Sequence, residues 1–494
     1  MAFEHGKKMI KNDTPKQPSL IDALIPLIVL IALLATTVFV FDKEEVGGPN
    51  MMALIIAATV AAFVGIKNGY SWKEIEEGMI DTISMSLHAV LILLMVGSLI
   101  GSWILAGTVP TMIYYGVDFI APDYFYMTSC LVCALVGFSI GSSWTVAGTL
   151  GIGLMGIAAA MDMSLAISAG AVISGAYFGD KLSPLSDTTN LASAVTGNNL
   201  FSHIQHMLWT TVPSFIIALS IFFMLGMGDR SQMVAADIVA LQNTLDKTFT
   251  INPLMLAPLV LLLIMAVKKL PALSTLITGT LVGCGFAVVF QWEAVTYLAD
   301  DSALSPIAAA FKGLFSAMYL GYSSNTGNEA LDSLLSKGGM GSMLYTIGLV
   351  VNAMAFGGAM AKTGLLQRLV NATLSRVRSA GGLITATVGS CIGTNIAAAD
   401  QYLSVVIPGQ MFVDSYKERN LSTLNLSRTL EDSGTLCSAL VPWNTCGAYL
   451  TATLGVSTFA YAPFAFFNIC CPIIAIIYGY SHFKLPPANS EASA

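Results

Sequence analysis

Apolar runs long enough to cross a lipid bilayer recur along the whole chain, and they constrain its fold more than any other feature. A helix needs about 20 apolar residues to cross the hydrocarbon core. The shorter runs leave two interpretations open for 124–161 and 380–413, which could be transmembrane spans or re-entrant hairpins. Either way, the sequence predicts an all-α polytopic membrane protein. The candidate spans lie at residues 21–41, 51–66, 87–107, 124–141, 144–161, 164–180, 203–226, 253–268, 271–291, 340–361, 380–393, 395–413, 424–440 and 458–480.

The composition supports this class and excludes others. Hydrophobic residues make up 55% of the 494 residues and charged residues only 10%, whereas soluble domains carry about 25% charged residues. Nothing in the chain indicates a nucleic-acid partner. The eight cysteines show neither metal-ligand nor secreted-framework spacing, so we expect reduced thiols inside the apolar runs. No cofactor is expected.

Basic residues orient the chain, because cytoplasmic loops of membrane proteins are enriched in Lys and Arg. Residues 1–20 carry four lysines and precede a long apolar run without a small-residue cleavage site, so 21–41 is predicted to be a span rather than a signal peptide. The acid-leaning loops 42–50 and 292–335 are expected outside. This assignment places both termini in the cytoplasm together with Lys67, Lys73, Lys268, Lys269, Lys362, Arg368, Arg376, Arg378, Lys417, Arg419 and Lys484.

An internal repeat divides the membrane part into two halves. A shift of 252 positions aligns residues 69–71 with 321–323, Gly137-x-x-Ile140-Gly141 with Gly389-x-x-Ile392-Gly393, and Asp180 with Asp432. An odd number of crossings per half would give the copies opposite orientation, as in the inverted repeats of many secondary transporters. The predicted organisation is a cytoplasmic tail 1–20, a first membrane repeat 21–226, a linker 227–250, a second membrane repeat 251–482 and a tail 483–494.

The segment 174–199 is a polar stretch between two runs that are apolar enough to cross a membrane. It contains Asp180 and Asp187 with Lys181 between the two acids. An ionised Asp at the bilayer centre costs about 2.5–3.5 kcal/mol on insertion scales, so intramembrane acids indicate function by default. Pro184 lacks an amide hydrogen and disfavours helix at Ser183, so the break should free backbone carbonyls. Irregular backbone at membrane depth is tolerated only where it is packed in protein or lines a wet cavity.

The polar breaks predict a cation site. Carboxylate, hydroxyl and carbonyl oxygens are hard ligands that suit Na⁺, and a buried carboxylate can hold either Na⁺ or a proton. We therefore interpret Asp180 and Asp187 as the exchanging pair, with no catalytic residue and no enzymatic activity. The neutral ligands expected in the same break are Ser183, Ser186, Thr188, Thr189 and Asn190, and the other breaks contribute Ser142, Ser143, Thr145, Thr394, Asn395, Asp432, Asn444 and Thr445.

Structural explanations remain open for several of these residues. Asp180 could simply neutralise Lys181 at a helix end, and Asp187 could be a helix N-cap. Three further expectations follow from position alone. Arg428, Glu431 and Asp432 share one helical face and could form a structural ion pair; Asp162, Asp400 and Asp414 lie near run ends and are expected in solvent; His203 and His206 open a membrane run and are expected at its interface.

The runs GSSWTVAGTLGIG (141–153) and GAYFGDKLSPLSDTTNLA (175–192) resemble the NhaC family of Na⁺/H⁺ antiporters. The second half agrees through LSRTLEDSGT (426–435), PWNTCGAY (442–449) and LGVSTFAYAPFAFFN (454–468). The resemblance covers nearly the whole chain. It implies a multi-pass antiporter of a prokaryotic inner membrane, with inverted repeats, paired hairpins, interrupted helices and a dimerising scaffold. On this view, residues 142–143 and 394–395 are hairpin-tip ligands.

The leading functional prediction is exchange of Na⁺ for H⁺ by competition for buried aspartates with alternating access. The alternative is an exchanger that couples Na⁺ and H⁺ to an organic anion, malate against lactate, because the family includes such members. An anion would need a cation or a helix N-terminus, which Lys181 or Arg428 could supply. An intramembrane aspartyl protease is disfavoured, because residues 177–180 lack the Gly-x-Gly-Asp form. A channel is disfavoured because the repeat suits alternating access.

Overall fold

The computed structural model describes residues 15–41, 47–228, 235–268, 270–300, 303–326, 332, 335–374 and 377–488. Within these residues the chain is helical, and the only β pairing is one bridge between Leu421 and Pro487. In chain order the elements are α1 (Leu20–Val40), α2 (Gly47–Lys67), α3 (Trp72–Leu105), α4 (Thr108–Phe119), η1 (Pro122–Tyr124), α5 (Phe125–Ile140), α6 (Ser143–Val146), η2 (Ala147–Gly151), α7 (Ile152–Ala160), α8 (Leu165–Leu182), α9 (Asp187–Thr196), α10 (Leu200–Gly228), α11 (Ala235–Thr248), η3 (Pro253–Leu256), α12 (Ala257–Val267), α13 (Ala272–Phe290), α14 (Trp292–Ala299), α15 (Pro306–Tyr319), α17 (Met340–Lys362), α18 (Leu365–Leu374), α19 (Ala380–Ala398), α20 (Gln401–Glu418), α21 (Thr423–Leu430), η4 (Glu431–Thr435), α22 (Leu436–Ser438), α23 (Thr445–Leu454), α24 (Thr458–Tyr461), η5 (Ala462–Phe464) and α25 (Phe466–Ser481).

The length and apolarity of these helices confirm a polytopic membrane protein. Eight helices of the described chain could each cross a bilayer, and two bent pairs raise this number to as many as 10. The predicted span 87–107 is only the end of the 34-residue helix α3. That helix starts earlier because Ser71 and Glu74 form a capping box at its N-terminus.

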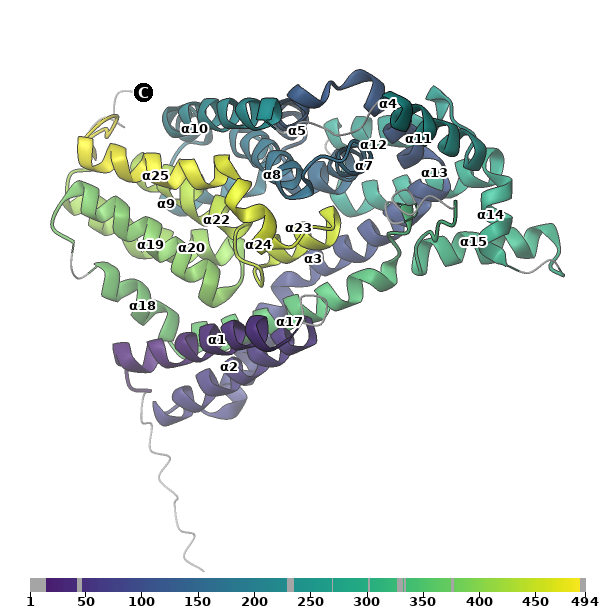
Figure 1. The fold of residues 1–494 in the computed structure, drawn as a ribbon. Coiled ribbons are helices and arrows are strands. Elements are labelled where there is room, and N and C mark those ends of the chain that lie inside the picture. Colours follow the sequence, from purple (N-terminus) through teal and green to yellow (C-terminus); the bar gives the residue numbers. More distant parts are fainter. Residues whose placement is uncertain are drawn as a thin grey trace, which may run out of the picture.

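The long helices α3 and α17 form a central unit with α1 and α2 on one side. Figure 1 shows α3 and α17 running side by side; α2 packs along α17, and α1 packs on α2. Gly78 and Gly358 lie at the crossing of α3 and α17, where added Cβ atoms would overlap the facing helix. Within the predicted linker, α11 is folded: Gln242 donates to the carbonyl oxygen of Tyr114 at 3.2 Å and to Asp118 at 2.9 Å.

The first half contains a hairpin followed by a broken helix. Helix α5 ends at Gly141, whose φ of +72° turns the chain. Helices α6 to α7 then lead back, because the amide of Ser164 donates to the Tyr126 hydroxyl at 2.9 Å near the start of α5. Helix α8 stops at Ser183, and α9 resumes after Ser186. The segment 124–161 therefore forms a hairpin with its tip in the protein interior.

Helices α5 and α8 run parallel and touch through glycines. Gly175 lies against the carbonyl oxygen of Cys130, and Gly179 lies against that of Ala134. A Cβ at either glycine would overlap these backbone atoms. The tip of the hairpin and the end of α8 therefore arrive at the same place, as close glycine packing in membrane helices allows.

The second half repeats this arrangement with different boundaries. Helix α19 continues past Gly393 to Ala398, and the chain turns at Ala399, whose φ is +57°. The predicted boundary between the runs 380–393 and 395–413 is therefore wrong by about five residues. Helix α20 returns, as the contact of 3.1 Å between the Thr387 and Tyr416 hydroxyls shows. The broken helix comprises α21, η4 and α22, a gap at 439–444, and α23. The inverted orientation of the two halves stays a prediction.

Candidate ion-binding site

The carboxylate of Asp180 is held by the tip of the first hairpin. One oxygen of Asp180 accepts hydrogen bonds from the amide of Ser143 at 2.9 Å and from the Ser143 hydroxyl at 2.7 Å. Asp180 is 6% exposed. The interpretation of Asp180 as a neutraliser of Lys181 does not hold, because the ammonium of Lys181 pairs with another acid. Hydrogen bonds of this kind stabilise an ionised carboxylate.

Two adjoining cavities, of about 130 and 340 Å³, meet at this point. We call them together the site cavity. Three carboxylates line it, from Asp180, Asp187 and Asp400. Neither cavity has a Lys or Arg among its lining residues in the described chain. The shared wall consists of His88, Gly141, Ser142, Asp187 and Ala272. A cavity with this lining favours a cation over an anion.

The predicted ligands divide into two groups. The first group consists of Asp180, Asp187 and seven neutral residues that line the site cavity or lie at its edge. Asp187 is the first residue of α9 and is exposed to the cavity, while the N-cap is Ser186, which accepts from the Thr189 amide at 3.4 Å. The seven residues are Ser142, Ser143, Thr145, Ser186, Thr188, Thr445 and, at the rim of the break, Ser183, whose Oγ faces Gly141.

The remaining predicted ligands stabilise the breaks instead of lining the cavity. Thr189 donates to the carbonyl oxygen of Lys181 at 3.0 Å, and Asn190 donates to those of Pro184 and Ser186. Asn395 lies within α19, not at a tip, and donates to the Gly434 carbonyl oxygen at 2.8 Å. Its own side-chain oxygen accepts from Asn444 at 3.0 Å.

Thr394 also lies within α19, with a buried hydroxyl that has no partner in the described chain. The second hairpin tip is at 399–400, one helical turn later, and the amide of Thr445 donates to the carbonyl oxygen of Ala399 at 2.9 Å. Each hairpin tip therefore touches the break of its own half. The repeat alignment placed the second tip at Gly393, but helix geometry continues through this glycine.

A buried ion pair joins the two broken helices. The ammonium of Lys181 bonds to Asp432, and the Thr210 hydroxyl donates to the same oxygen of Asp432 at 3.0 Å. Both charged side chains are 0% exposed. Asp432 is therefore engaged by Lys181 and does not line the site cavity. Its repeat partner Asp180 does.

The predicted ion pair of Arg428 with Glu431 or Asp432 is absent from the described chain. Arg428 donates to the carbonyl oxygen of Lys484 at 3.2 Å, and Glu431 accepts from the Thr435 hydroxyl at 3.0 Å. The π-helical turn η4 interrupts the regular spacing assumed for this helical face. His203 and His206 are buried too, and His206 contacts the side-chain oxygen of Asn425 at 3.2 Å. Their position at the membrane interface stays a prediction.

Sequence reasoning missed Asp400 as a site residue. It was expected in solvent but is 7% exposed, caps α20 by accepting from the Leu403 amide at 2.9 Å, and lines the site cavity. Asp162 and Asp414 are exposed, as predicted. The signal that could have identified Asp400 is its place between two apolar runs of near-equal length, which is where a hairpin tip belongs.

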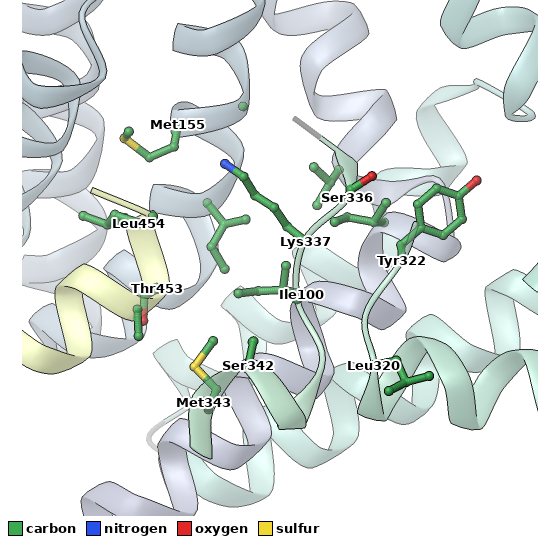
Figure 2. Close-up of a pocket in the computed structure, with 17 residues that line it drawn as sticks. Ile100, Met155, Leu320, Tyr322, Ser336, Lys337, Ser342, Met343, Thr453 and Leu454 are labelled. Carbon is green, nitrogen blue, oxygen red and sulfur yellow. The ribbon is translucent and has the colours of Figure 1, made fainter. Parts of the chain in front are cut away.

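A third cavity, of about 430 Å³, lies further along the same helices and shares no lining residue with the site cavity. We call it the distal cavity. Figure 2 shows the Lys337 side chain extending into it between Met155 and Leu454. Lys337 belongs to the segment that leads into α17, while Met155 and Leu454 lie on α7 and α23.

An aromatic pair lies between the levels of the two cavities, because Trp144 lines the site cavity and Tyr449 lies on α23 between residues that line one cavity and the other. The rings of Trp144 and Tyr449 stack at 4.2 Å with 7° between their planes, and the Tyr449 hydroxyl donates to the carbonyl oxygen of Trp144 at 2.8 Å. Gly148 and the buried Val96 complete this layer, because a Cβ at Gly148 would lie 2.6 Å from the Tyr449 hydroxyl and 3.5 Å from Val96. We call these four residues the barrier.

Two interrupted helices, two hairpin tips, an acidic cavity and an aromatic barrier inside a polytopic bundle define a secondary transporter for a cation. A family model described as the Na⁺/H⁺ antiporter family matches residues 175–483. This chain belongs to that family.

Three relatives match almost the full chain. The Na⁺/H⁺ antiporter NhaC of Alkalihalophilus pseudofirmus is 40% identical over 459 residues, 92% of this chain and 94% of the relative. The malate-2H⁺/Na⁺-lactate antiporter of Bacillus subtilis is 36% identical over 94% of this chain and 95% of the relative. An uncharacterised Na⁺/H⁺ antiporter of Haemophilus influenzae is 36% identical over 94% and 97%.

Proposed function

We propose that this protein exchanges Na⁺ for H⁺ across the cytoplasmic membrane of a prokaryote, by competition of the two ions for the carboxylates of the site cavity. The observation that carries the proposal is the convergence of Asp180, Asp187 and Asp400 on one cavity with no lining Lys or Arg in the described chain. Such a cavity must take up a cation or protons, because Asp180 and Asp400 are buried and unbalanced buried carboxylates cost several kcal/mol.

The two cavities support alternating access as part of this proposal. With both termini in the cytoplasm, as the distribution of Lys and Arg favours, α3 runs outward from Trp72 to Leu105. The site cavity lies along residues 85–92 of α3 and the distal cavity along residues 100–104. The site then faces the cytoplasm, and the barrier closes it toward the outside. A dimerising scaffold built on α1, α2, α3 and α17 is part of the same proposal.

The decisive experiment compares neutralised aspartates in everted vesicles. In Asp180→Asn and Asp187→Asn we expect loss of the Na⁺-dependent dequenching of a pH dye, because an amide can neither release a proton nor neutralise Na⁺. Asp414→Asn is the matched control, since Asp414 is exposed and lies outside the cavity. Near-normal exchange by both cavity variants at equal expression would rule out this site.

An exchanger of organic anions is the second candidate, favoured by the name of the Bacillus subtilis malate and lactate relative. The cations suggested for it are Lys181 and Arg428, which are fully buried and do not line the site cavity. Uptake of labelled malate and lactate into proteoliposomes, with and without a Na⁺ gradient, separates the two candidates. Uptake that tracks the Na⁺ gradient would favour the second.

A further inference from the structure

The distal cavity contains a positive charge, on the exposed residue Lys337, that Na⁺/H⁺ exchange by the site cavity does not use. Lys337 is the one Lys or Arg that lines this cavity in the described chain, and its ammonium forms no ion pair there. The surrounding walls are largely apolar, from Ile100, Ile104, Ile152 and Met155 among others. Figure 2 shows the ammonium directed away from its own segment, toward α7 and α23.

The two cavities lie at two levels along the helices that carry them. On α3 the site cavity ends at Ile92 and the distal cavity begins at Ile100; on α23 the corresponding residues are Cys446 and Ala452. Eight residues of α-helix span about 12 Å, and six residues span about 9 Å. A shift of the two hairpins and broken helices by about 9–12 Å along α3 would carry Asp180 and Asp187 from the site cavity to the level of the distal cavity.

Lys337 would not move with them. It follows α15 and precedes α17, and its backbone is joined to this part of the chain by a bond of 3.1 Å from the Tyr322 amide to the Lys337 carbonyl oxygen. The next residues are fixed on α3, where the Gly339 amide donates to the Gly97 carbonyl oxygen at 2.7 Å. The Lys337 ammonium therefore lies at the level that the site with bound Na⁺ would reach after the shift.

We infer that Lys337 is a built-in competitor for Na⁺, which faces the transported carboxylates only in the outward state, lowers their affinity for Na⁺ there and favours release of the ion to the outside. This inference rests on the proposed Na⁺/H⁺ exchange and adds the group that lowers the Na⁺ affinity of the outward state. An ammonium within about 6 Å of a bound Na⁺ at an effective dielectric constant near 20 weakens its binding at least about tenfold. In the observed state the barrier separates Lys337 from the site, so Na⁺ entering from the cytoplasm is unaffected.

The test uses the full-length protein in proteoliposomes of known orientation, with ²²Na⁺ fluxes started from either side. For Lys337→Gln we expect the KM for Na⁺ on the distal side to fall by about tenfold or more, while the KM on the other side stays unchanged. Lys337→Arg, which keeps the charge, should behave as the unaltered protein does. Equal KM changes on both sides, or none on the distal side, would overturn the inference.

Chemical rescue guards against a folding defect. Lys337→Cys should show the low distal KM, and modification with a cationic aminoethyl thiosulfonate should restore the high value, whereas a neutral methyl thiosulfonate should not. If Lys337→Gln instead abolishes lactate uptake and leaves both Na⁺ KM values unchanged, the lysine binds an anion and the inference is wrong. Loss of Na⁺ flux in Asp180→Asn, without any effect of Lys337→Gln, would support the proposed function alone.

Discussion

At the scale of the residue, the pairing of Lys181 with Asp432 explains why adjacent acids in this chain have different roles. Lys181 follows Asp180 directly in sequence, yet its ammonium bonds to the second half of the chain. Asp180 therefore accepts a hydrogen bond from Ser143 at the hairpin tip and lines the site cavity. The ion pair thus fixes the two broken helices against each other without occupying the site.

Removal of one partner of this pair should destabilise the protein. Lys181→Ala leaves Asp432 buried without a counter-charge, which costs about 3–5 kcal/mol. The double variant Lys181→Met/Asp432→Leu should recover most of this loss, because a buried ion pair can be replaced by apolar groups of similar volume. Thermal unfolding in detergent measures both. A double variant no more stable than the single one would contradict this role.

Asp400 combines a structural and an electrostatic role that substitution can separate. Asn caps helices as well as Asp does, so Asp400→Asn should keep the stability of α20 and weaken Na⁺ binding by removing a cavity charge. Asp400→Ala should in addition lose about 1 kcal/mol of stability. ²²Na⁺ binding and thermal unfolding of the purified variants check the two effects, with Asp162→Asn as an exposed control. Unchanged Na⁺ affinity in both variants would exclude Asp400 from the site.

At the scale of the element, the barrier depends on stacking between two helices from opposite halves. Trp144 lies on α6 and Tyr449 on α23, and each helix begins directly after a break. The same elements that line the site cavity therefore also carry the aromatic pair of the barrier. Movement of either helix start must change both the site and the barrier.

Truncation of the stack should open a leak. Tyr449→Ala removes the ring, so we expect Na⁺ efflux from proteoliposomes without a pH gradient. Tyr449→Phe keeps the stack and loses only the hydrogen bond to the Trp144 carbonyl oxygen, worth about 1 kcal/mol, and it should remain tight. Equal leakage from the two variants would show that the hydroxyl, and not the ring, closes the path.

At the scale of the whole molecule, the two cavities should open to opposite sides of the membrane. Met85 and Leu320 line the site and distal cavities and are 60% and 74% exposed. An impermeant thiol reagent should label Met85→Cys in everted vesicles and Leu320→Cys in right-side-out vesicles. The native cysteines are free, and all are buried except Cys470, which is partly buried. Both variants are therefore made in a protein that carries Cys470→Ser. Labelling of both positions from one side would contradict the proposed orientation.

Sequence alone predicted the membrane class, the broken helices and several residues that line the site cavity, because apolar length and a proline-containing break are local signals. Their role in ion binding stays a prediction. The prediction from sequence failed where contacts between residues distant in the chain determine the structure. The burial of His206 depends on Asn425, and that of Asp400 depends on a hairpin longer than its repeat partner. The partner of Lys181 lies 251 residues away, so sequence neighbours pointed to Asp180 instead.

The glycine contacts between α5 and α8 have a mechanical consequence for transport. Backbone packed directly on backbone leaves no side chain that could yield, so Ser143 and Asp180 keep their spacing whatever the two helices do together. Under the proposed function, Ser143 and Asp180 would therefore move together, and the protein could change the side of the membrane to which the ion has access without breaking the hydrogen bonds at the site.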